Sequence, residues 1–541
     1  MQRDEVVTIQ FPNGSSTQIN TGLFVSNKFI SSESGKSFEV FNPTNGKVIC
    51  RVAEASAKDV DNAVQAARDA FEQSWGLHVN GFERARLLNK LADLMEKEGD
   101  TLAMLEALDN GKTLAMAKAA DVPKSIQCLR YYAGWADKIH GKTIEVNDDT
   151  NLVYTRHEPI GVCAQIIPWN FPLLMLAWKI GPALATGNTI VMKTAEQTPL
   201  SALKVCELIV QAGFPPGVFN IVMGFGPTTG AALSSHMGVD KIAFTGSTAV
   251  GRHILKSASE SNLKKTQLQQ ITLELGGKSP NIIFDDADIA QAIKWSNFGI
   301  YFNHGQCCAA GSRIFVQESI YPKFIEEFSK ISSQMSVGDP FHETTFQGPQ
   351  ISQLQFDRIM NHIEIGKKDA KLLYGGNRKG EEGYFIEQTV FTDVPEDSRI
   401  MKEEIFGPVV VINTFKDEDE VIRRANSTEY GLAAGIFTRD LSRAHRVARR
   451  LQAGTVWINH YNDYAMNVPF GGYKQSGIGR ELGKYALANY TSIKSVNINL
   501  VLCLSEGHKW FKSDENECFS RSPFDTNLST VILHQFSTQV I

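Results

Sequence analysis

Two adjacent cysteines, Cys307 and Cys308, lie in a run of small residues, Gly305-Gln306-Cys307-Cys308-Ala309-Ala310-Gly311-Ser312. A thiol between small residues can be approached by a substrate, and at the start of a helix the dipole favours the thiolate. The same pattern also occurs where a cysteine only packs, so this run alone leaves both interpretations open. His304 could suggest a Cys–His pair, but we interpret it as a surface or capping histidine.

A carboxylate, Glu274, ends an apolar run in the segment Thr272-Leu273-Glu274-Leu275-Gly276-Gly277-Lys278-Ser279-Pro280. Burial at that point raises the pKa of a carboxylate toward the range of a general base. The glycines that follow allow another group to approach the backbone closely. The alternative is an edge-of-strand glutamate in a salt bridge.

An asparagine, Asn170, stands between aromatic residues and prolines in Ile167-Pro168-Trp169-Asn170-Phe171-Pro172. A buried amide needs a partner, and a rigid NH₂ group in a dry pocket can stabilise an oxyanion. The alternative is an asparagine that only shapes a turn.

Two glycine-rich turns, Gly224–Gly230 and Gly246–Gly251, each follow an apolar run. One such turn is weak evidence, but two at strand ends indicate dinucleotide binding at helix N-termini.

Short apolar runs that end in Gly or Pro alternate with helical stretches from Gly161 onward. Before them, Ser56 to Asp59 resembles a capping box at the start of one helix. The spacing of the apolar residues from Leu87 to Met95 predicts a second, amphipathic helix. The runs predict buried parallel strands at Val162–Ile167, Thr189–Lys193, Val218–Met223, Lys241–Phe244 and Ile271–Leu275. A second α/β set begins near Pro280 and continues through Trp457-Ile458-Asn459.

The composition is that of a globular protein, with 43% hydrophobic and 21% charged residues among 541. The net charge of −5 gives no electrostatic reason to expect nucleic acid or an anionic membrane as a partner. The eight cysteines include no C-x-x-C pair, so we expect neither a disulfide scaffold nor a metal site. The N-terminus lacks signal-peptide features and the apolar stretch 166–185 is broken by prolines, which favours the cytoplasm.

Together these segments resemble the aldehyde dehydrogenase superfamily, in particular its fungal NAD(P)-dependent acetaldehyde-type members. The similarity runs from about Gly22 to about Leu500. Its motifs occur in the family's order: Pro-Trp-Asn-Phe-Pro, Phe-Thr-Gly-Ser-Thr, Leu-Glu-Leu-Gly-Gly-Lys-Ser-Pro, Gly-Gln-Cys-Cys, Glu-Glu-Ile-Phe-Gly-Pro and Pro-Phe-Gly-Gly-Tyr-Lys.

The resemblance implies oxidation of aldehydes to carboxylic acids through a thiohemiacetal and a thioester. It places the nucleophile at Cys308, the general base at Glu274 and the transition-state amide at Asn170. Cys307 falls on a variable position. The implied cofactor is NAD⁺, with NADP⁺ as the alternative, and no metal is implied. The implied cofactor contacts are Ile166, Trp169, Lys193, Glu196, Gly226, Gly230, Phe244, Gly246, Ser247, Thr248, Gly251, Leu275, Glu404 and Phe406.

The implied architecture is α/β, with a Rossmann-like cofactor domain, an α/β catalytic domain and a small strand arm for oligomerisation. We expect an N-terminal arm over 1–21 and a cofactor domain over 22–141 and 160–275. The catalytic domain is expected over 276–476, and the oligomerisation arm over 142–159 and 485–500. An arm of this kind exposes strand edges, so the resemblance implies a homodimer or homotetramer.

The chain departs from the family pattern in two places. A few residues more than expected precede the Glu274 strand, between Leu263 and Leu273, and a shift of register there would turn Glu274 away from the site. Residues 501–541 extend past the usual end, and their polar, aperiodic composition predicts disorder. Three rival functions remain: a semialdehyde dehydrogenase for a charged substrate, a cofactor-free cysteine hydrolase, and a non-enzymatic protein on the same scaffold.

Overall fold

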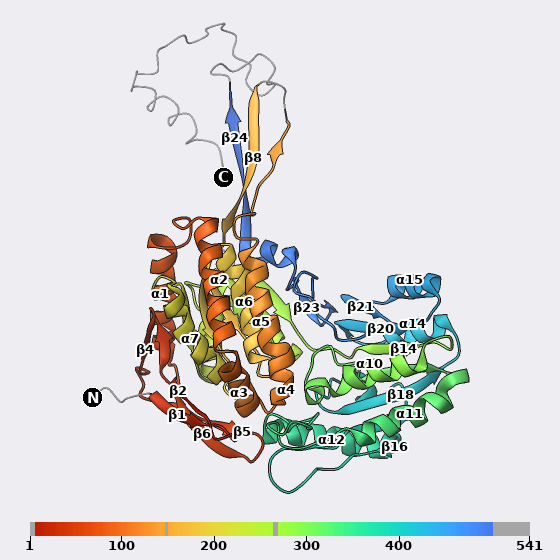
Figure 1. Cartoon of the computed structure of the whole chain (residues 1–541). Coiled ribbons are helices and arrows are strands. Elements are labelled where there is room, and N and C mark those ends of the chain that lie inside the picture. Colours follow the sequence, from red (N-terminus) through yellow and green to blue (C-terminus); the bar gives the residue numbers. More distant parts are fainter. Residues whose placement is uncertain (1–5, 147–149, 263–268, 501–541) are drawn as a thin grey trace, which may run out of the picture. The chain divides into compact units, whose positions relative to one another are not determined.

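The computed structural model describes residues 6–146, 150–262 and 269–500 (Figure 1). The described chain divides into a larger unit, up to Ile139 and over Glu158–Ser492, and a smaller one, His140–His157 with the residues from Ile493 on. The predicted 501–541 disorder and most of the extra residues before Glu274 lie outside the described residues.

The first sheet of the larger unit has eight strands in the order β23-β13-β12-β9-β10-β11-β3-β4. Its five central strands run parallel, and they are β9 (Val162–Ile166), β10 (Thr189–Lys193), β11 (Phe219–Val222), β12 (Lys241–Thr245) and β13 (Gln270–Glu274). Each ends within one residue of its predicted bounds, because buried parallel strands appear in the sequence as unbroken apolar runs. Antiparallel strands β3 (Leu23–Val25), β4 (Lys28–Ile30) and β23 (Gly477–Ile478) complete the edges.

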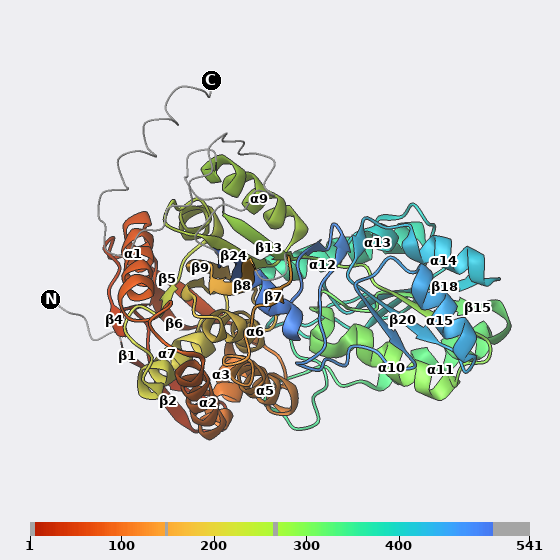
Figure 2. The same ribbon diagram turned by 90° about the horizontal axis from the view of Figure 1, so that it is seen from above.

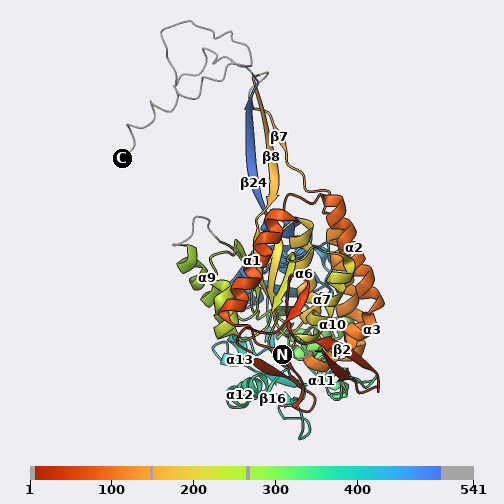
Figure 3. The same cartoon turned by 90° about the vertical axis from the view of Figure 1, so that its left-hand side faces the viewer.

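Helices cover both faces of this sheet. Figures 2 and 3 show α1 (Ala57–Gln73) and α9 (Thr248–Asn262) on one side, with α2 (Gly81–Lys97) and α3 (Gly99–Asn110) on the other. The layer of α2 also contains α5 (Val122–Ala133), α6 (Pro172–Ala185) and α7 (Leu200–Ala212). The predicted capping box is present at Ser56, whose side chain accepts from the Asp59 N–H. The described residues contain no helix that is long and apolar enough to cross a membrane.

The second sheet has seven strands in the order β16-β17-β18-β15-β14-β20-β21, all parallel except β16. They are β14 (Pro280–Ile283), β15 (Arg313–Gln317), β16 (Lys371–Tyr374), β17 (Thr389–Thr392), β18 (Val409–Phe415), β20 (Ala433–Phe437) and β21 (Thr455–Ile458). Its helices are α10 (Ile289–Tyr301), α11 (Tyr321–Gln334), α12 (Gln353–Asp369), α13 (Arg399–Lys402), α14 (Glu418–Asn426) and α15 (Leu441–Arg450). Both sheets lie in the larger unit, which bears out the predicted α/β class.

Residues 6–20 of the predicted N-terminal arm form a packed hairpin. Strands β1 (Val6–Gln10) and β2 (Ser16–Asn20) pair antiparallel. Ile9 and Ile19 are 2% and 0% exposed, and both join the larger hydrophobic core. Their alternation with polar residues is the two-residue period of a half-buried strand, which the polar composition conceals.

The smaller unit holds the outer parts of a three-stranded sheet in the order β24-β8-β7. Strand β7 (Thr143–Ile144) pairs antiparallel with β8 (Asn151–Pro159), and the Leu500 N–H donates to the Thr150 carbonyl over 2.8 Å. Strand β24 spans Thr491–Asn499. The predicted arm began at 485, but residues Lys484–Tyr490 form a short 3₁₀ segment that belongs to the larger unit.

Candidate active site

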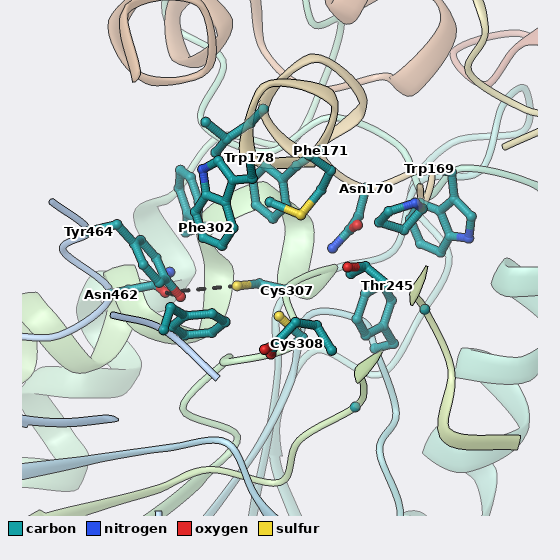
Figure 4. Close-up of a pocket in the computed structure, with 18 of the residues that line it drawn as sticks. Trp169, Asn170, Phe171, Trp178, Thr245, Phe302, Cys307, Cys308, Asn462 and Tyr464 are labelled. Carbon is teal, nitrogen blue, oxygen red and sulfur yellow. Dashed lines mark hydrogen bonds between the residues drawn. The ribbon is translucent and has the colours of Figure 1, made fainter. Parts of the chain in front are cut away.

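A cavity of about 350 Å³ in the larger unit brings the three predicted catalytic side chains together. Figure 4 shows two of them, Asn170 and Cys308. Asn170, Glu274 and Cys308 all line it, although they come from three distant parts of the sequence. Its apolar wall includes Met116, Phe171, Leu174, Met175, Trp178, Phe298, Phe302 and Phe470.

The two thiols differ in their access to this cavity. Cys307 is buried and Cys308 is half-buried, and both follow a turn in which Asn303 and His304 have positive φ. The Cys307 sulfur lies 3.8 Å from Asn462 Oδ1. Contact with Cys307 raises the pKa of the Cys308 thiol, and burial raises it further. The more accessible thiol therefore rests protonated in this state.

Asn170 is held by the same turn. Its Nδ2 donates to the Gln306 carbonyl over 3.0 Å, and its backbone carbonyl accepts from Asn303 Nδ2 over 2.9 Å. An amide NH₂ has two donors. The Gln306 bond uses one and fixes the group, which leaves the second for a ligand in the cavity.

Glu274 ends strand β13 in parallel register with β12, opposite Thr245. Neither of its carboxylate oxygens has a hydrogen-bond partner among the described residues. Burial raises the pKa of Glu274 well above its ordinary value, as does the negative charge of Glu481, and Lys179 opposes them. A Cβ on Gly471 would stand 2.7 Å from Glu274 Oε1, so this glycine makes room for the carboxylate.

An ion pair that the sequence did not reveal lies beside Glu274. The Lys179 ammonium, on helix α6, is fully buried and contacts the Glu481 carboxylate and Thr245 Oγ1, the latter over 2.7 Å. The only signal in the sequence is one lysine in an otherwise apolar helix, because its partner is 302 residues away.

Several predicted cofactor residues line the same cavity: Trp169, Gly246, Ser247, Leu275, Glu404 and Phe406. Glu404 Oε1 accepts from the Gly277 N–H over 2.9 Å, and burial raises the pKa of Glu404 to about 7. Trp169 and Phe406 meet edge to face at 5.2 Å.

The other predicted cofactor residues lie at or just beyond the carboxyl ends of the first sheet's strands and do not line the cavity. Lys193 Nζ donates to the Thr194 carbonyl over 2.9 Å and lies 3.5 Å from Glu196 Oε2, while burial lowers the pKa of Lys193. The other predicted cofactor residues that do not line the cavity are Ile166, Gly226, Gly230, Phe244, Thr248 and Gly251.

The space around two of these glycines fits a nucleotide. A Cβ on Gly226 would meet nothing within 4 Å, and one on Gly230 would approach the Lys193 side chain at 3.6 Å. Glu196 is partly exposed beside them. This open ledge next to a lysine–glutamate pair suits the ribose and phosphates of a dinucleotide.

His304 is buried and not at the surface, which corrects the sequence interpretation. Its Nδ1 accepts from the Gly348 N–H over 2.9 Å, and it does not line the cavity. Two further polar side chains of the cavity, Asn462 and Tyr464, had no signal in the sequence. No group of three or more potential metal-ligand side chains lies among the described residues.

The fold and the site define a two-sheet α/β enzyme with a thiol, an amide and a carboxylate in one cavity. Residues 29–496 match the model of the aldehyde dehydrogenase family. An aldehyde dehydrogenase of Emericella nidulans is 63% identical over 480 residues, which cover 88% of this chain and 95% of that protein. The human mitochondrial aldehyde dehydrogenase is 55% identical over 88% of this chain and 92% of its own length.

Solved structures agree with the sequence matches. A structure of the NAD⁺ complex of an aldehyde dehydrogenase from Bacillus cereus superposes with a TM-score of 0.87 at 50% identity, and covers 92% of this chain and 100% of that one. The chain belongs to the aldehyde dehydrogenase family. It is an NAD(P)-dependent oxidoreductase that converts aldehydes to acids, so the predicted family, fold class and reaction are confirmed.

Proposed function

We propose that Cys308 is the nucleophile of this oxidation, that Asn170 stabilises the oxyanion and that Glu274 activates water. The observation that carries the proposal is the convergence of a cavity-facing thiol, an amide with a spare donor and an unpaired buried carboxylate on one cavity. No metal ligand takes part in these roles.

In the first half of the reaction, the Cys308 thiol gives its proton to water and the sulfur bonds to the aldehyde carbon. The carbonyl oxygen becomes an oxyanion, which the spare Asn170 N–H and the Cys308 backbone N–H receive. Loss of one such donor typically costs about 10²–10³ in rate. Bound NAD⁺ supplies the acceptor for the hydrogen and electron pair that leave the aldehyde carbon.

In the second half, a thioester on Cys308 is hydrolysed. Glu274 takes a proton from water, the water oxygen bonds to the acyl carbon, and the carbon–sulfur bond breaks to release the acid. The raised pKa of Glu274 suits this role, because a base works best when its pKa is near the operating pH.

NAD⁺ is the cofactor that the chain's own residues favour. The Glu196 carboxylate can accept hydrogen bonds from ribose hydroxyls, whereas a 2′-phosphate would be repelled by about 4 kcal/mol per charge pair at about 4 Å. Lys193, 3.5 Å away, offsets part of this repulsion, so NADP⁺ remains the weaker alternative. The Bacillus cereus relative that binds NAD⁺ supports this preference.

The charges of the cavity favour a neutral aldehyde over the charged semialdehyde of the rival function. Its lining includes two cations, Lys124 and Arg358, and four carboxylates. Lys124 donates to the Tyr464 carbonyl over 3.0 Å, and Arg358 donates to the Glu404 carbonyl over 3.1 Å. Lys124 also lies 3.9 Å from Asp463 Oδ1, and the lining carboxylates outnumber the two cations, which disfavours a substrate that carries a negative charge.

The proposed assembly is a homodimer or homotetramer through the edges of the smaller unit, and the proposed location is the cytoplasm. Sedimentation at micromolar concentration tests the assembly, and a monomer alone would contradict it.

The test of function is NADH production from acetaldehyde, a longer alkyl aldehyde, an aromatic aldehyde and succinic semialdehyde, with NAD⁺ and NADP⁺ in parallel. We expect the neutral aldehydes to be oxidised faster than the semialdehyde, and NAD⁺ to be preferred. Ester cleavage without any NADH would instead support a cofactor-free cysteine hydrolase.

A further inference from the structure

Two asparagines that the proposed mechanism does not use, Asn303 and Asn110, bind the loop that carries Asn170. Neither lines the cavity, and their side chains are 7% and 0% exposed. Asn170 follows strand β9 of the first sheet, whereas Cys308 lies between α10 and β15 of the second sheet. An oxyanion donor acts only at a set distance from the reacting carbon, so these two loops must be fixed relative to each other.

The Nδ2 group of Asn303 bridges the two loops. It donates to the Asn170 backbone carbonyl over 2.9 Å and to the Gln306 carbonyl over 3.1 Å. The Gln306 carbonyl also accepts from Asn170 Nδ2 over 3.0 Å, so three hydrogen bonds close a ring. The bond to Gln306 alone would restrain only the Asn170 side chain, whereas the ring restrains its backbone as well. Because Gln306 lies two residues before Cys308, the ring connects the nucleophile's loop directly to Asn170.

The backbone of Asn303 adds a second requirement at the same position. Its φ is 49° and its ψ is 37°, which is the left-handed region. Asparagine is one of the few residues with a side chain that tolerate this region, and its NH₂ group has the two hydrogens that the two carbonyls need. Glycine would meet the first requirement alone.

Asn110, the last residue of α3, holds the same loop from the first-sheet side. Its Nδ2 donates to the Trp169 carbonyl over 2.6 Å and lies 3.4 Å from the Asn170 carbonyl. Its Oδ1 accepts from the Lys112 N–H over 3.2 Å, which orients the amide. The carbonyls of two successive residues, Trp169 and Asn170, are therefore both bound by buried amides.

We propose that Asn303 and Asn110 are positioning residues of the oxidation, which hold Asn170 so that its second N–H is directed at the oxyanion beside Cys308. Figure 4 shows the Asn170 amide nitrogen directed toward the two cysteines. Asn303 and Asn110 do not touch the substrate and act only through Asn170. The proposal rests on the proposed function, because it requires that Asn170 stabilises the oxyanion.

The experiment measures the rate of the first NADH release in a single turnover, at saturating NAD⁺ and acetaldehyde. Asn303→Gly keeps the left-handed backbone and removes both donors, and should slow this step about 10- to 10²-fold through misplacement of Asn170. Asn110→Ala removes one net hydrogen bond from a helical position that suits alanine, and should slow it about 3- to 10-fold. Asn170→Ala should slow it by more, about 10²–10³-fold.

A double-mutant cycle separates positioning from a general loss of structure. With Asn170→Ala already present, Asn303→Gly or Asn110→Ala should change the rate by less than about threefold, because no amide remains to be positioned. A change that only loosens the fold would slow both backgrounds by the same factor. Affinity for NAD⁺ should stay unchanged in every variant.

Asn27→Gly is the matched control. Asn27 lies between β3 and β4, outside the cavity, with a φ of 61°, and its Nδ2 donates to the Phe214 carbonyl over 2.8 Å. This variant also removes a carbonyl-bound asparagine at positive φ, so it shows what such a change costs in melting temperature. Its NADH release should match that of the wild type.

Each asparagine is judged by its own cycle. Equal slowing in both backgrounds, or no slowing at all, would overturn the positioning role and leave the proposed function standing. If Asn303→Gly does not fold, the Asn110→Ala cycle decides by the same criterion. If Asn170→Ala alone keeps the wild-type rate, the proposed role of Asn170 is wrong, and the positioning role is wrong with it.

Discussion

The buried imidazole of His304 predicts that the protein becomes less stable as the pH falls. His304 is 1% exposed, and its Nδ1 accepts the Gly348 N–H. Burial lowers the pKa of His304 from 6.5 to about 3, and the positive charge of Lys112 acts in the same direction. The ring is therefore neutral in the folded protein throughout the physiological range.

The unfolded chain, in contrast, binds a proton at this histidine below about pH 6.5. Between pH 6.5 and about 3 the unfolded state holds more protons, so the free energy of unfolding falls as the pH falls. Above pH 6.5 both states are neutral and His304 contributes no pH dependence. At pH 5, which is about 1.5 pH units below the pKa of this histidine in the unfolded chain, the free energy of unfolding should be about 2 kcal/mol lower, because each pH unit contributes about 1.36 kcal/mol.

The variant His304→Asn isolates this contribution. Asparagine offers Oδ1 as an acceptor for the Gly348 N–H, and it tolerates the left-handed backbone that His304 adopts at φ 62°. Loss of the ring's packing lowers the free energy of unfolding by the same amount at every pH. The pH dependence that comes from protonation of His304 is absent from the variant. We expect urea unfolding at pH 7, 6 and 5 to show the wild type losing about 2 kcal/mol more than the variant. Parallel curves for the two proteins would refute the reasoning, and refolding at each pH checks reversibility.

The remaining predictions concern the proposed site. Glu274→Gln should still release about one NADH per site and then turn over about 10²–10⁴-fold more slowly, because a general base is lost; full turnover would contradict the assignment. In the wild type, turnover should decline as the pH falls through the raised pKa of Glu274, at a pH above that of an ordinary glutamate, and the Gln variant should lack this step. Cys308→Ser should abolish the NADH burst, whereas Cys307→Ser should retain it; the reverse result would move the nucleophile to Cys307. Lys179→Met should move the acidic side of the pH–turnover profile to higher pH, because Lys179 lowers the pKa of Glu274; an unchanged profile would argue against this coupling. The same variant should destabilise the fold by roughly 3–5 kcal/mol, because the buried Glu481 carboxylate loses its cation.

The strands of the first sheet could be predicted closely because their signal is local. Thr189–Lys193 is apolar over its whole length apart from its ends, and the structure buries every residue of it. The catalytic roles predicted for Cys308, Glu274 and Asn170 came from motifs of a known family, and the structure places all three residues at one cavity. Their chemical roles stay predictions.

The features that the sequence did not reveal depend on distant partners. Lys179 contacts Glu481 across 302 residues, and the turn that carries His304 meets Gly348 across 44. Nothing near either residue in the sequence indicates these contacts, because they arise only when separate elements pack. The N-terminal hairpin was not predicted for another reason: its few apolar residues alternate with polar ones, so its two short strands do not stand out as apolar runs.

The edge of the first sheet also has a consequence for biosynthesis. Strand β13, which carries Glu274, pairs on one side with β12 and on the other with the two-residue strand β23, through Leu273 with Ile478 and Glu274 with Gly477. A ribosome that adds about 5–20 residues per second needs roughly 10–40 s to make the intervening 200 or so residues. Throughout that interval the nascent chain presents an unpaired strand edge of the kind that invites aggregation. One of the last segments of the larger unit to be translated thus closes the sheet beside the proposed base, and a chain that stalls before Gly477 would leave that edge open.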